Sequence, residues 1–372
     1  MKEWMGRREP LNCSTIRNII RLVLLNKGKI HPKYWYRLLV AWITSWLFLP
    51  IRIIERIRFY RKIKKTKITH PPIFIIGHWR TGTTFLHYLM AEDKSKAFVS
   101  NLDAYGANFS LVAGKFTKKI VRFAIPEKRP MDDVLLSIDR PGEEEFAMAM
   151  KQKQSFYHAF VFPQKIEYFS RFITFKECSK KEVTKWKKGY YFFIQKICWK
   201  NHGKQLILKS PPNTGRVQQL VEMFPEAKFI FLTRNPYEIF ASTTLLFKRL
   251  LPYFSLQKWN LETIQQNILK IFKEMHEEYE RSKESLPKNQ LIEIRYEDLI
   301  TEPLEELKRI YQQLKIDGFE ENKKFFEQFI STQKDYKKNI HEISKTIIST
   351  VNNHWTNYFK KYLYEKVSKL TK

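Results

Sequence analysis

The chain has 372 residues, of which 43% are hydrophobic and only 11 are glycine, and this composition excludes wholesale disorder, collagen and most glycine-rich β repeats. Its three cysteines are odd in number and widely spaced, which argues against a disulfide framework or a cysteine zinc site and favours a reducing compartment. The net charge of +29 predicts an attraction to polyanions such as nucleic acid, anionic lipid or a phosphorylated small molecule.

Much of this charge lies in a basic and apolar arm over residues 1–70, which holds 17 basic and 3 acidic side chains. The apolar run at 38–51, LLVAWITSWLFLPI, is shorter than the roughly 20 residues that a membrane-spanning helix needs. Basic residues on both sides and tryptophans in the run are typical of a helix in a membrane interface. We expect residues 16–67 to contact a membrane surface. The alternative is that these helices pack on the core and the basic residues are solvated.

The remaining residues, 71–372, are expected to form one domain in which strands and helices alternate. Short apolar runs predict buried strands at 73–76, 206–209, 228–233 and 291–294. Helices are predicted at 85–92, at 141–150 with Pro141 in the first turn, and at 236–250, 303–314 and 343–370. This alternation predicts an α/β fold of the phosphate-loop type, with three layers, α/β/α, around a central, mostly parallel sheet.

The first strand leads into the segment FIIGHWRTGTTFLHYL at 74–89. Its frame G-x-x-x-x-G-T-T, from Gly77 to Thr84, has the spacing of a phosphate-binding loop, in which backbone N–H groups at a helix N-terminus bind an anion. The alternative is a tight strand–helix turn without a ligand. A threonine stands at position 83, where a nucleotide triphosphatase has its lysine, and the nearest cation is Arg80.

Two later strands end beside cations rather than beside the aspartate that a triphosphatase uses to hold magnesium. Lys209 ends one strand and Arg234 follows another. Cations at these positions suit an anionic phosphate held without a metal, which argues against a kinase or ATPase. Ser242 lies about two helical turns after Arg234, and an arginine fork with a hydroxyl suits a second phosphate. The histidines lack metal-ligand spacing, so no metal is predicted.

At these motifs the chain resembles the sulfotransferases that use 3′-phosphoadenosine 5′-phosphosulfate. RTGTT at 80–84 resembles that family's 5′-phosphosulfate loop, and RNPYEIFAS at 234–242 resembles its 3′-phosphate motif. RYEDL at 295–299 resembles the segment whose tyrosine lies by the adenine. The segment 206–236 is similar to the bacterial branch grouped with the tyrosylprotein-type enzymes. The resemblance extends from about residue 71 to 364 and leaves the arm unexplained.

The resemblance implies a role for each matching residue. The donor's 5′-phosphosulfate would be held by Arg80, Thr81, Gly82, Thr83 and Thr84. Its 3′-phosphate and adenine would be contacted by Arg234, Ser242 and Tyr296. Lys209 would lie beside the bridging oxygen, and the nucleotide product would be 3′,5′-adenosine bisphosphate. The glycine-containing basic motif of cytosolic members is absent, and Lys337 and Lys338 are expected to complete the 3′-phosphate site instead.

The acceptor hydroxyl needs a general base, and the best candidates lie in the acidic run DRPGEEEFAMAM at 139–150. This run resembles the P-x-E-D-E segment of the bacterial branch, with Glu143 and Glu145 matching its two glutamates. Glu145 is preferred because it adjoins the apolar stretch, where partial desolvation would raise its pKa. The alternative is that these carboxylates cap a helix N-terminus. His78 and His158 are rival candidates for ligand contact.

These observations predict a sulfotransferase that moves a sulfuryl group in line to a hydroxyl or amine acceptor, with positive charge from Arg80 and Lys209. The aromatic content of 15% and the apolar arm favour a hydrophobic or lipid-like acceptor, and residues 95–205 are expected to shape its pocket. We expect a cytoplasmic protein at the membrane periphery. The alternatives are a phosphate-loop kinase-like enzyme and a non-catalytic basic protein that binds membranes or nucleic acid, although no nucleic-acid-binding motif is recognised.

Overall fold

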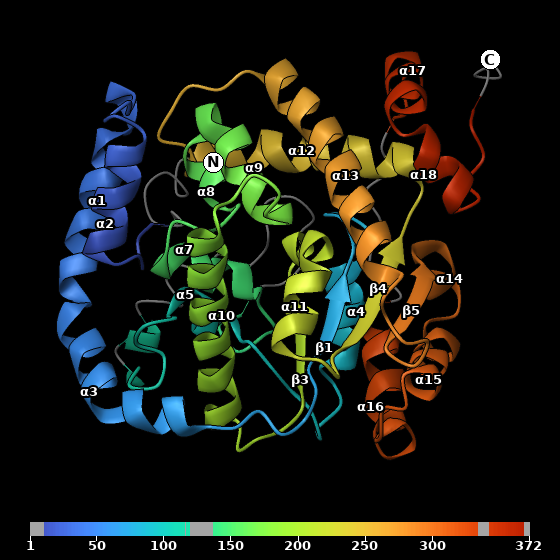
Figure 1. Ribbon diagram of the computed structural model, residues 1–372, viewed down its shortest axis with the longest axis horizontal. Helices are drawn as coiled ribbons and strands as arrows, with labels where there is room; N and C mark the ends of the chain where they lie inside the picture. Colours follow the sequence, from blue (N-terminus) through green and yellow to red (C-terminus); the bar gives the residue numbers. More distant parts are fainter. Residues whose placement is uncertain (1–10, 116, 120–136, 334–341, 368–372) are drawn as a thin grey trace.

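The computed structural model describes residues 11–115, 117–119, 137–333 and 342–367. At the centre of this part of the chain lies a sheet of five parallel strands in the order β2-β3-β1-β4-β5 (Figure 1). The strands are β1 (Ile73–Ile76), β2 (Ala97–Phe98), β3 (Leu206–Lys209), β4 (Lys228–Thr233) and β5 (Leu291–Arg295). The predicted α/β fold with a parallel sheet is confirmed. The sequence did not reveal β2, because two residues are too few to form a recognisable apolar run.

Helices cover both faces of the sheet. They are α4 (Thr83–Met90), α5 (Asn101–Tyr105), α7 (Glu144–Lys151), α8 (His158–Val161), α9 (Ile166–Thr174), α10 (Lys180–Lys200), α11 (Val217–Met223), α12 (Pro236–Phe254), α13 (Leu261–Lys283), α14 (Tyr296–Thr301), α15 (Pro303–Gln313), α16 (Phe319–Thr332), α17 (Lys345–His354) and α18 (Thr356–Lys361). Because alternate side chains of a strand point to opposite faces, Ile73 and Ile75 pack with α4, α15 and α16. Phe74 and Ile76 pack in a second cluster, with α7 to α13. Both faces are therefore buried, which explains why the strands are apolar throughout.

Two helical segments differ from the sequence-based expectation. Helix α7 begins at Glu144 instead of near residue 141, because Pro141 forms an isolated antiparallel bridge with Ser100. The segment expected as one C-terminal helix forms two, α17 and α18. Between them Trp355 is buried, and its ring stacks on Phe272 with 3.7 Å between ring centroids.

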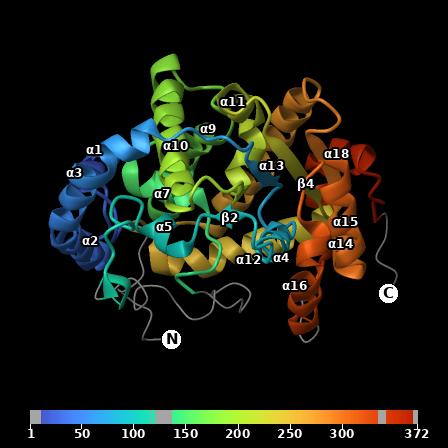
Figure 2. The same ribbon diagram turned by 90° about the horizontal axis from the view of Figure 1, so that it is seen from below.

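The arm folds into helices along one side of the molecule, and α10 lies between the arm and the sheet (Figure 1, Figure 2). These helices are α1 (Ile16–Leu25), α2 (Trp35–Leu47) and α3 (Leu49–Lys65). The apolar run at 38–51 is broken, because Pro50 in the first turn of α3 lacks the N–H that would continue α2. No single helix of the described residues is long and apolar enough to cross a membrane. Two consecutive helical segments meet these criteria of length and composition only when they are taken together. They are Pro32–Leu47 and Leu49–Lys65, and the chain bends by 43° between them.

The inner side of the arm attaches to the domain through buried polar side chains. Asn18 Nδ2 donates a hydrogen bond to the carbonyl oxygen of Ala149 in α7, at 2.8 Å. Glu55 of α3 forms an ion pair with Lys196 of α10, with 2.6 Å between carboxylate oxygen and ammonium nitrogen. Both side chains of this pair are buried. The arm is therefore docked on the domain by specific interactions along its inner side.

Replacing Glu55 with Gln should lower the free energy of unfolding by about 3–5 kcal/mol, because the Lys196 ammonium would stay buried without its counter-charge. Urea unfolding measures this loss, and the exposed Glu305→Gln serves as the matched control. A loss below about 1 kcal/mol, similar to an ordinary surface substitution, would mean that the pair does not stabilise the fold.

Candidate active site

The loop between β1 and α4 depends on two glycines. Gly77 has a φ of +146°, and a Cβ there would lie 2.7 Å from Thr81 Oγ1 and 2.8 Å from the carbonyl oxygen of Leu232. Gly82, with a φ of +91°, is the N-cap of α4, where a Cβ would collide with the ring of Tyr296. Because Gly82 has no side chain to cap α4, the first N–H groups of this helix can bind an anion.

Arg80 connects this loop to the second predicted anion site. Its φ of +72° is unusual for a residue with a side chain. Its Nε donates to Ser242 Oγ of α12 at 2.9 Å, and its carbonyl oxygen accepts a hydrogen bond from Arg234 Nη1 at 2.7 Å. The Arg234 guanidinium carbon lies 4.3 Å from the centroid of the Tyr296 ring. The structure thus brings together residues that the sequence places in three separate motifs.

Arg234 has one hydrogen-bond donor without a partner. Its Nη2 pairs with Glu238 at 3.0 Å, but its Nε is buried and has no acceptor among the described residues. An unsatisfied buried donor is costly, and a phosphate oxygen is a strong acceptor for a guanidinium. This position therefore suits an anionic ligand.

The end of β3 adds a lysine and a carboxylate beside the loop. Lys209 Nζ pairs with the Glu143 carboxylate and lies 3.3 Å from Thr84 Oγ1. The hydroxyl of Tyr157 donates to the other oxygen of Glu143, and burial raises the pKa of this tyrosine well above its usual value. The Glu143 side chain is 17% exposed, so it can still meet a ligand.

Glu145, in contrast, faces the protein interior. It forms an ion pair with Arg216 at 2.5 Å in which both side chains are fully buried. Its carboxylate also accepts hydrogen bonds from Ser155 Oγ at 2.8 Å and from the backbone N–H of Phe156 at 2.9 Å. Of these two carboxylates, Glu143 is therefore the one that stays partly exposed, whereas the sequence-based preference was for Glu145. That preference relied on partial desolvation beside the apolar stretch, and the sequence did not reveal the ion pair with Arg216.

The two candidate histidines are packed in the core as neutral rings. Burial lowers the pKa of His78 to about 3 and that of His158 to about 4. His78 Nδ1 lies 3.0 Å from the carbonyl oxygen of Trp79, and His158 Nε2 lies 2.9 Å from that of Gln152. The Thr81 hydroxyl is likewise used within the protein, since it donates to the His78 carbonyl oxygen at 2.8 Å.

Sequence reasoning did not single out Thr214, Tyr157 or Arg216. Thr214 Oγ1 accepts a hydrogen bond from the backbone N–H of Gly77 at 2.7 Å and so ties the phosphate loop to the segment after β3. The only sequence signal for Thr214 and Arg216 is their place in the run SPPNTGR that directly follows Lys209. Tyr157 lies in no recognised motif.

Two further expectations concern the ligands of the site. Lys337 and Lys338, expected to complete the 3′-phosphate site, lie outside the described residues. Within the residues that the structure describes, no group of three or more His, Cys, Asp or Glu side chains could hold a metal ion.

Two candidate anion sites meet at one loop, at the carboxyl ends of neighbouring parallel strands of an α/β protein, where ligands of open α/β sheets bind. The chain belongs to the sulfotransferase family, whose sequence profile matches residues 71–321. It is therefore a sulfotransferase, as the motifs predict.

Individual relatives support this assignment. The chain is 29% identical over 347 residues to the omega-hydroxy-beta-dihydromenaquinone-9 sulfotransferase Stf3 of Mycobacterium tuberculosis and of Mycobacterium bovis, covering 93% of this chain and 89% of each relative. Its fold is similar to that of sulfotransferase STF9 from Mycobacterium avium, with a TM-score of 0.67 and 13% identity over 95% of this chain and 97% of that one. Sulfotransferase STF1 from Mycobacterium tuberculosis follows with a TM-score of 0.61 and 16% identity, over 91% and 90% of the two chains.

Glu144 should make the stability of the protein depend on pH. Its buried carboxylate accepts hydrogen bonds from Tyr190 and Asn213, and burial raises its pKa from 4.5 to about 7. Between these values the folded protein keeps a proton that the unfolded chain releases. The free energy of unfolding should therefore fall as the pH rises through this window, by about 1.4 kcal/mol per pKa unit.

The Glu144→Gln variant should show a smaller fall, because it has no proton to lose at this position. Urea unfolding on both sides of the window compares the two proteins, and the exposed Glu305→Gln should keep the wild-type pH dependence. Equal falls in the wild type and in Glu144→Gln would show that this carboxyl does not titrate as proposed.

Proposed function

We propose that this sulfotransferase takes its sulfuryl group from 3′-phosphoadenosine 5′-phosphosulfate and transfers it to a hydroxyl of a hydrophobic, lipid-like acceptor. The observation that carries the proposal is the contact between the two anion sites: Arg80 after β1 bonds to both Ser242 and Arg234, which belong to the site after β4. A nucleoside with an anionic group at each end needs two such sites a short distance apart.

The residues present fit this donor. The unpartnered Nε of Arg234 suits the 3′-phosphate. Ser242, whose hydroxyl accepts a hydrogen bond from Arg80, belongs to the same site. The first N–H groups of α4 and the Thr84 hydroxyl suit the 5′-phosphosulfate. The ring of Tyr296 lies between the two sites, against Arg234 and beside Gly82, where it can contact the adenosine. When bound, the donor supplies an activated sulfuryl group on a phosphate leaving group.

Glu143 is the proposed general base. It accepts the proton of the acceptor hydroxyl while that oxygen bonds to sulfur and the bond from sulfur to the phosphate oxygen breaks. Lys209, paired with Glu143 and 3.3 Å from Thr84 Oγ1, places positive charge where the leaving oxygen gathers negative charge. Tyr157 donates to the same carboxylate and orients it.

The surroundings of Glu143 support a lipid-like acceptor. The ring of Phe146 lies 4.7 Å from that of Tyr157 and 5.0 Å from that of Tyr105, measured between centroids. These aromatic residues belong to the segment 95–205 that the sequence assigns to the acceptor pocket. The name of the mycobacterial relative Stf3 specifies an omega-hydroxylated dihydromenaquinone, which supports the same chemical class.

Replacing Glu143 with Gln should lower kcat by a factor of about 10² to 10⁴, the usual contribution of a general base, while binding of 3′,5′-adenosine bisphosphate is retained. Steady-state sulfation assays with a hydroxylated quinone measure the first effect, and thermal melting with the bisphosphate measures the second. Glu145→Gln is the comparison: it should destabilise the fold by leaving the Arg216 charge unpaired. A Glu143→Gln enzyme with wild-type kcat would exclude Glu143 as the base.

Replacing Arg234 with Ala should abolish stabilisation by the bisphosphate. A ligand at about 100 times its Kd adds roughly 2.7 kcal/mol to the free energy of unfolding, which raises the Tm of the wild type by several degrees. Arg309→Ala, on the surface of α15, should keep this rise. A rise with magnesium-ATP and none with the bisphosphate would contradict the proposed donor and favour a kinase-like enzyme.

A further inference from the structure

Exposed hydrophobic side chains are concentrated on the arm. Of 15 exposed large hydrophobic side chains in the described residues, 13 lie between Ile20 and Tyr60, and the other two are Ile300 and Leu363. Leu24 is 71% exposed and Ile57 is 78% exposed. We call the exposed apolar side chains of α1, α2 and α3 from Ile20 to Ile57 the outer face of the arm. Exposed apolar side chains that are concentrated in this way mark an interaction site.

Helix α2 and part of α3 have the reverse of the polarity found in soluble amphipathic helices. Helix α2 buries Arg37 and Ser45, whereas Trp46 on its other side is exposed. Helix α3 buries Glu55 and exposes Ile57. In a helix on a water-facing surface the polar side chains point outward. In α2, Arg37 and Ser45 point toward the protein, and the outer face of this helix is suited to an apolar environment. In α3, the exposed Arg56 and Arg58 flank Ile57, so basic side chains accompany the apolar ones.

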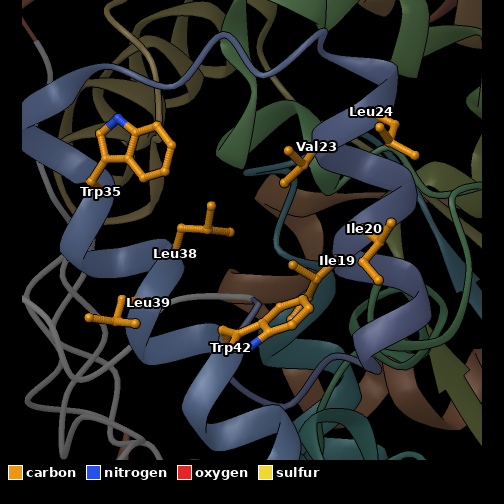
Figure 3. Close-up of a pocket in the computed structure, with 8 residues that line it drawn as sticks. All are labelled: Ile19, Ile20, Val23, Leu24, Trp35, Leu38, Leu39 and Trp42. Carbon is orange, nitrogen blue, oxygen red and sulfur yellow. The ribbon is translucent and has the colours of Figure 1, made fainter.

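A cavity on the outer face continues this apolar character. It lies between α1 and α2, has a volume of about 300 Å³ and is lined only by apolar side chains between Ile19 and Trp42. In Figure 3 the ring of Trp42 reaches from α2 toward Ile19 of α1. Nothing that lines it can form a strong hydrogen bond, apart from the indole N–H groups at its edge. The cavity therefore suits hydrocarbon chains.

The charges around the outer face are of one sign. From residue 11 to residue 70 the sequence has a single acidic side chain, Glu55, and that one is buried in its ion pair with Lys196. Arg61 and Lys64 are exposed and follow Ile57 by four and seven residues, so they lie on the same face of α3 as Ile57. The surface thus has apolar side chains with Arg56 and Arg58 among them and Arg61 and Lys64 at its edge, which matches an anionic lipid bilayer.

The contacts of the inner side favour an arm that lies in the plane of the membrane. Arg37 Nη1 donates to the carbonyl oxygen of Ser255 at 2.8 Å, and Glu55 is paired with Lys196. Moving α2 and α3 away from the domain to cross a bilayer would leave these buried charged groups without their partners, at a cost of several kcal/mol. An arm that stays docked can insert only its outer face.

We propose that the outer face of the arm docks on an anionic bilayer surface, with its tryptophans and isoleucines among the lipid chains and Arg61 and Lys64 among the lipid phosphates. The surface is separate from the transfer chemistry. If the proposed lipid-like acceptor is correct, docking would bring the active site to a membrane-borne hydroxyl.

Vesicle flotation with the full chain tests the proposal. The protein should float with phosphatidylcholine vesicles that contain phosphatidylglycerol, and only weakly with phosphatidylcholine alone. The double variant Trp35→Glu with Trp46→Glu, at side chains that are 56% and 52% exposed, should bind at least about tenfold more weakly. Ile300→Glu with Leu363→Glu, at the two exposed apolar positions outside the arm, is the matched control and should bind like the wild type.

The charged edge is tested in the same assay. Arg61→Glu with Lys64→Glu should lower binding about tenfold or more, because each basic residue near an anionic surface contributes about 1 kcal/mol. Lys288→Glu with Lys323→Glu makes the same change in net charge elsewhere on the surface and should have little effect. Raising the salt concentration should weaken wild-type binding.

Three results would overturn the proposal: no flotation of the folded wild type, equal losses in the arm variants and their controls, or self-association through the outer face without vesicle binding. A cooperative thermal unfolding transition without ligand, measured for every variant, shows that each is folded. Because flotation involves no nucleotide, its outcome is independent of whether the proposed donor and acceptor are correct.

Discussion

The buried ion pair between Glu145 and Arg216 is the interaction on which the active-site geometry depends. It joins the first turn of α7 to the segment that follows β3, and Arg216 Nε also donates to the Phe172 carbonyl oxygen of α9 at 2.8 Å. A charge pair without solvent contact tolerates little displacement, since either group alone would be strongly destabilising. It therefore holds the first turn of α7 against the segment after β3, and with it the position of Glu143 against Lys209.

Three consecutive glutamates consequently occupy three different electrostatic environments. Glu143 contacts a lysine and a tyrosine hydroxyl at the edge of the solvent, and Glu145 is held by a guanidinium. Glu144 has neutral hydrogen-bond donors, so burial favours its protonated form. One short acidic run thus provides a partly exposed carboxylate, a buried carboxyl with a raised pKa and a structural ion. Glu143 precedes the helix in an extended conformation, and the helical residues Glu144 and Glu145 point about 100° apart, which separates the surroundings of the three.

The sequence was most informative where local pattern decides structure. Apolar runs predicted four strands, and glycine spacing located the loop from Gly77 to Thr84, because both depend on residues close together in the chain. The choice between Glu143 and Glu145 depends on Arg216, about 70 residues later, and no local pattern reports such a partner. The arm shows the same limit. Its composition pointed to a membrane surface or to packing on the core, but only the fold shows that opposite sides of the same helices carry the packing and the exposed apolar surface.

The hydrogen bond from Arg234 to the carbonyl oxygen of Arg80 has a thermodynamic consequence. Arg80 has an unfavourable backbone conformation, and the residue that helps to hold it there belongs to the other anion site. An anion that orders Arg234 therefore also favours the shape of the loop after β1. Linkage makes any such effect reciprocal, so the affinities of the two ends would change by the same factor. The two ends would then act as one cooperative unit toward a ligand that reaches both.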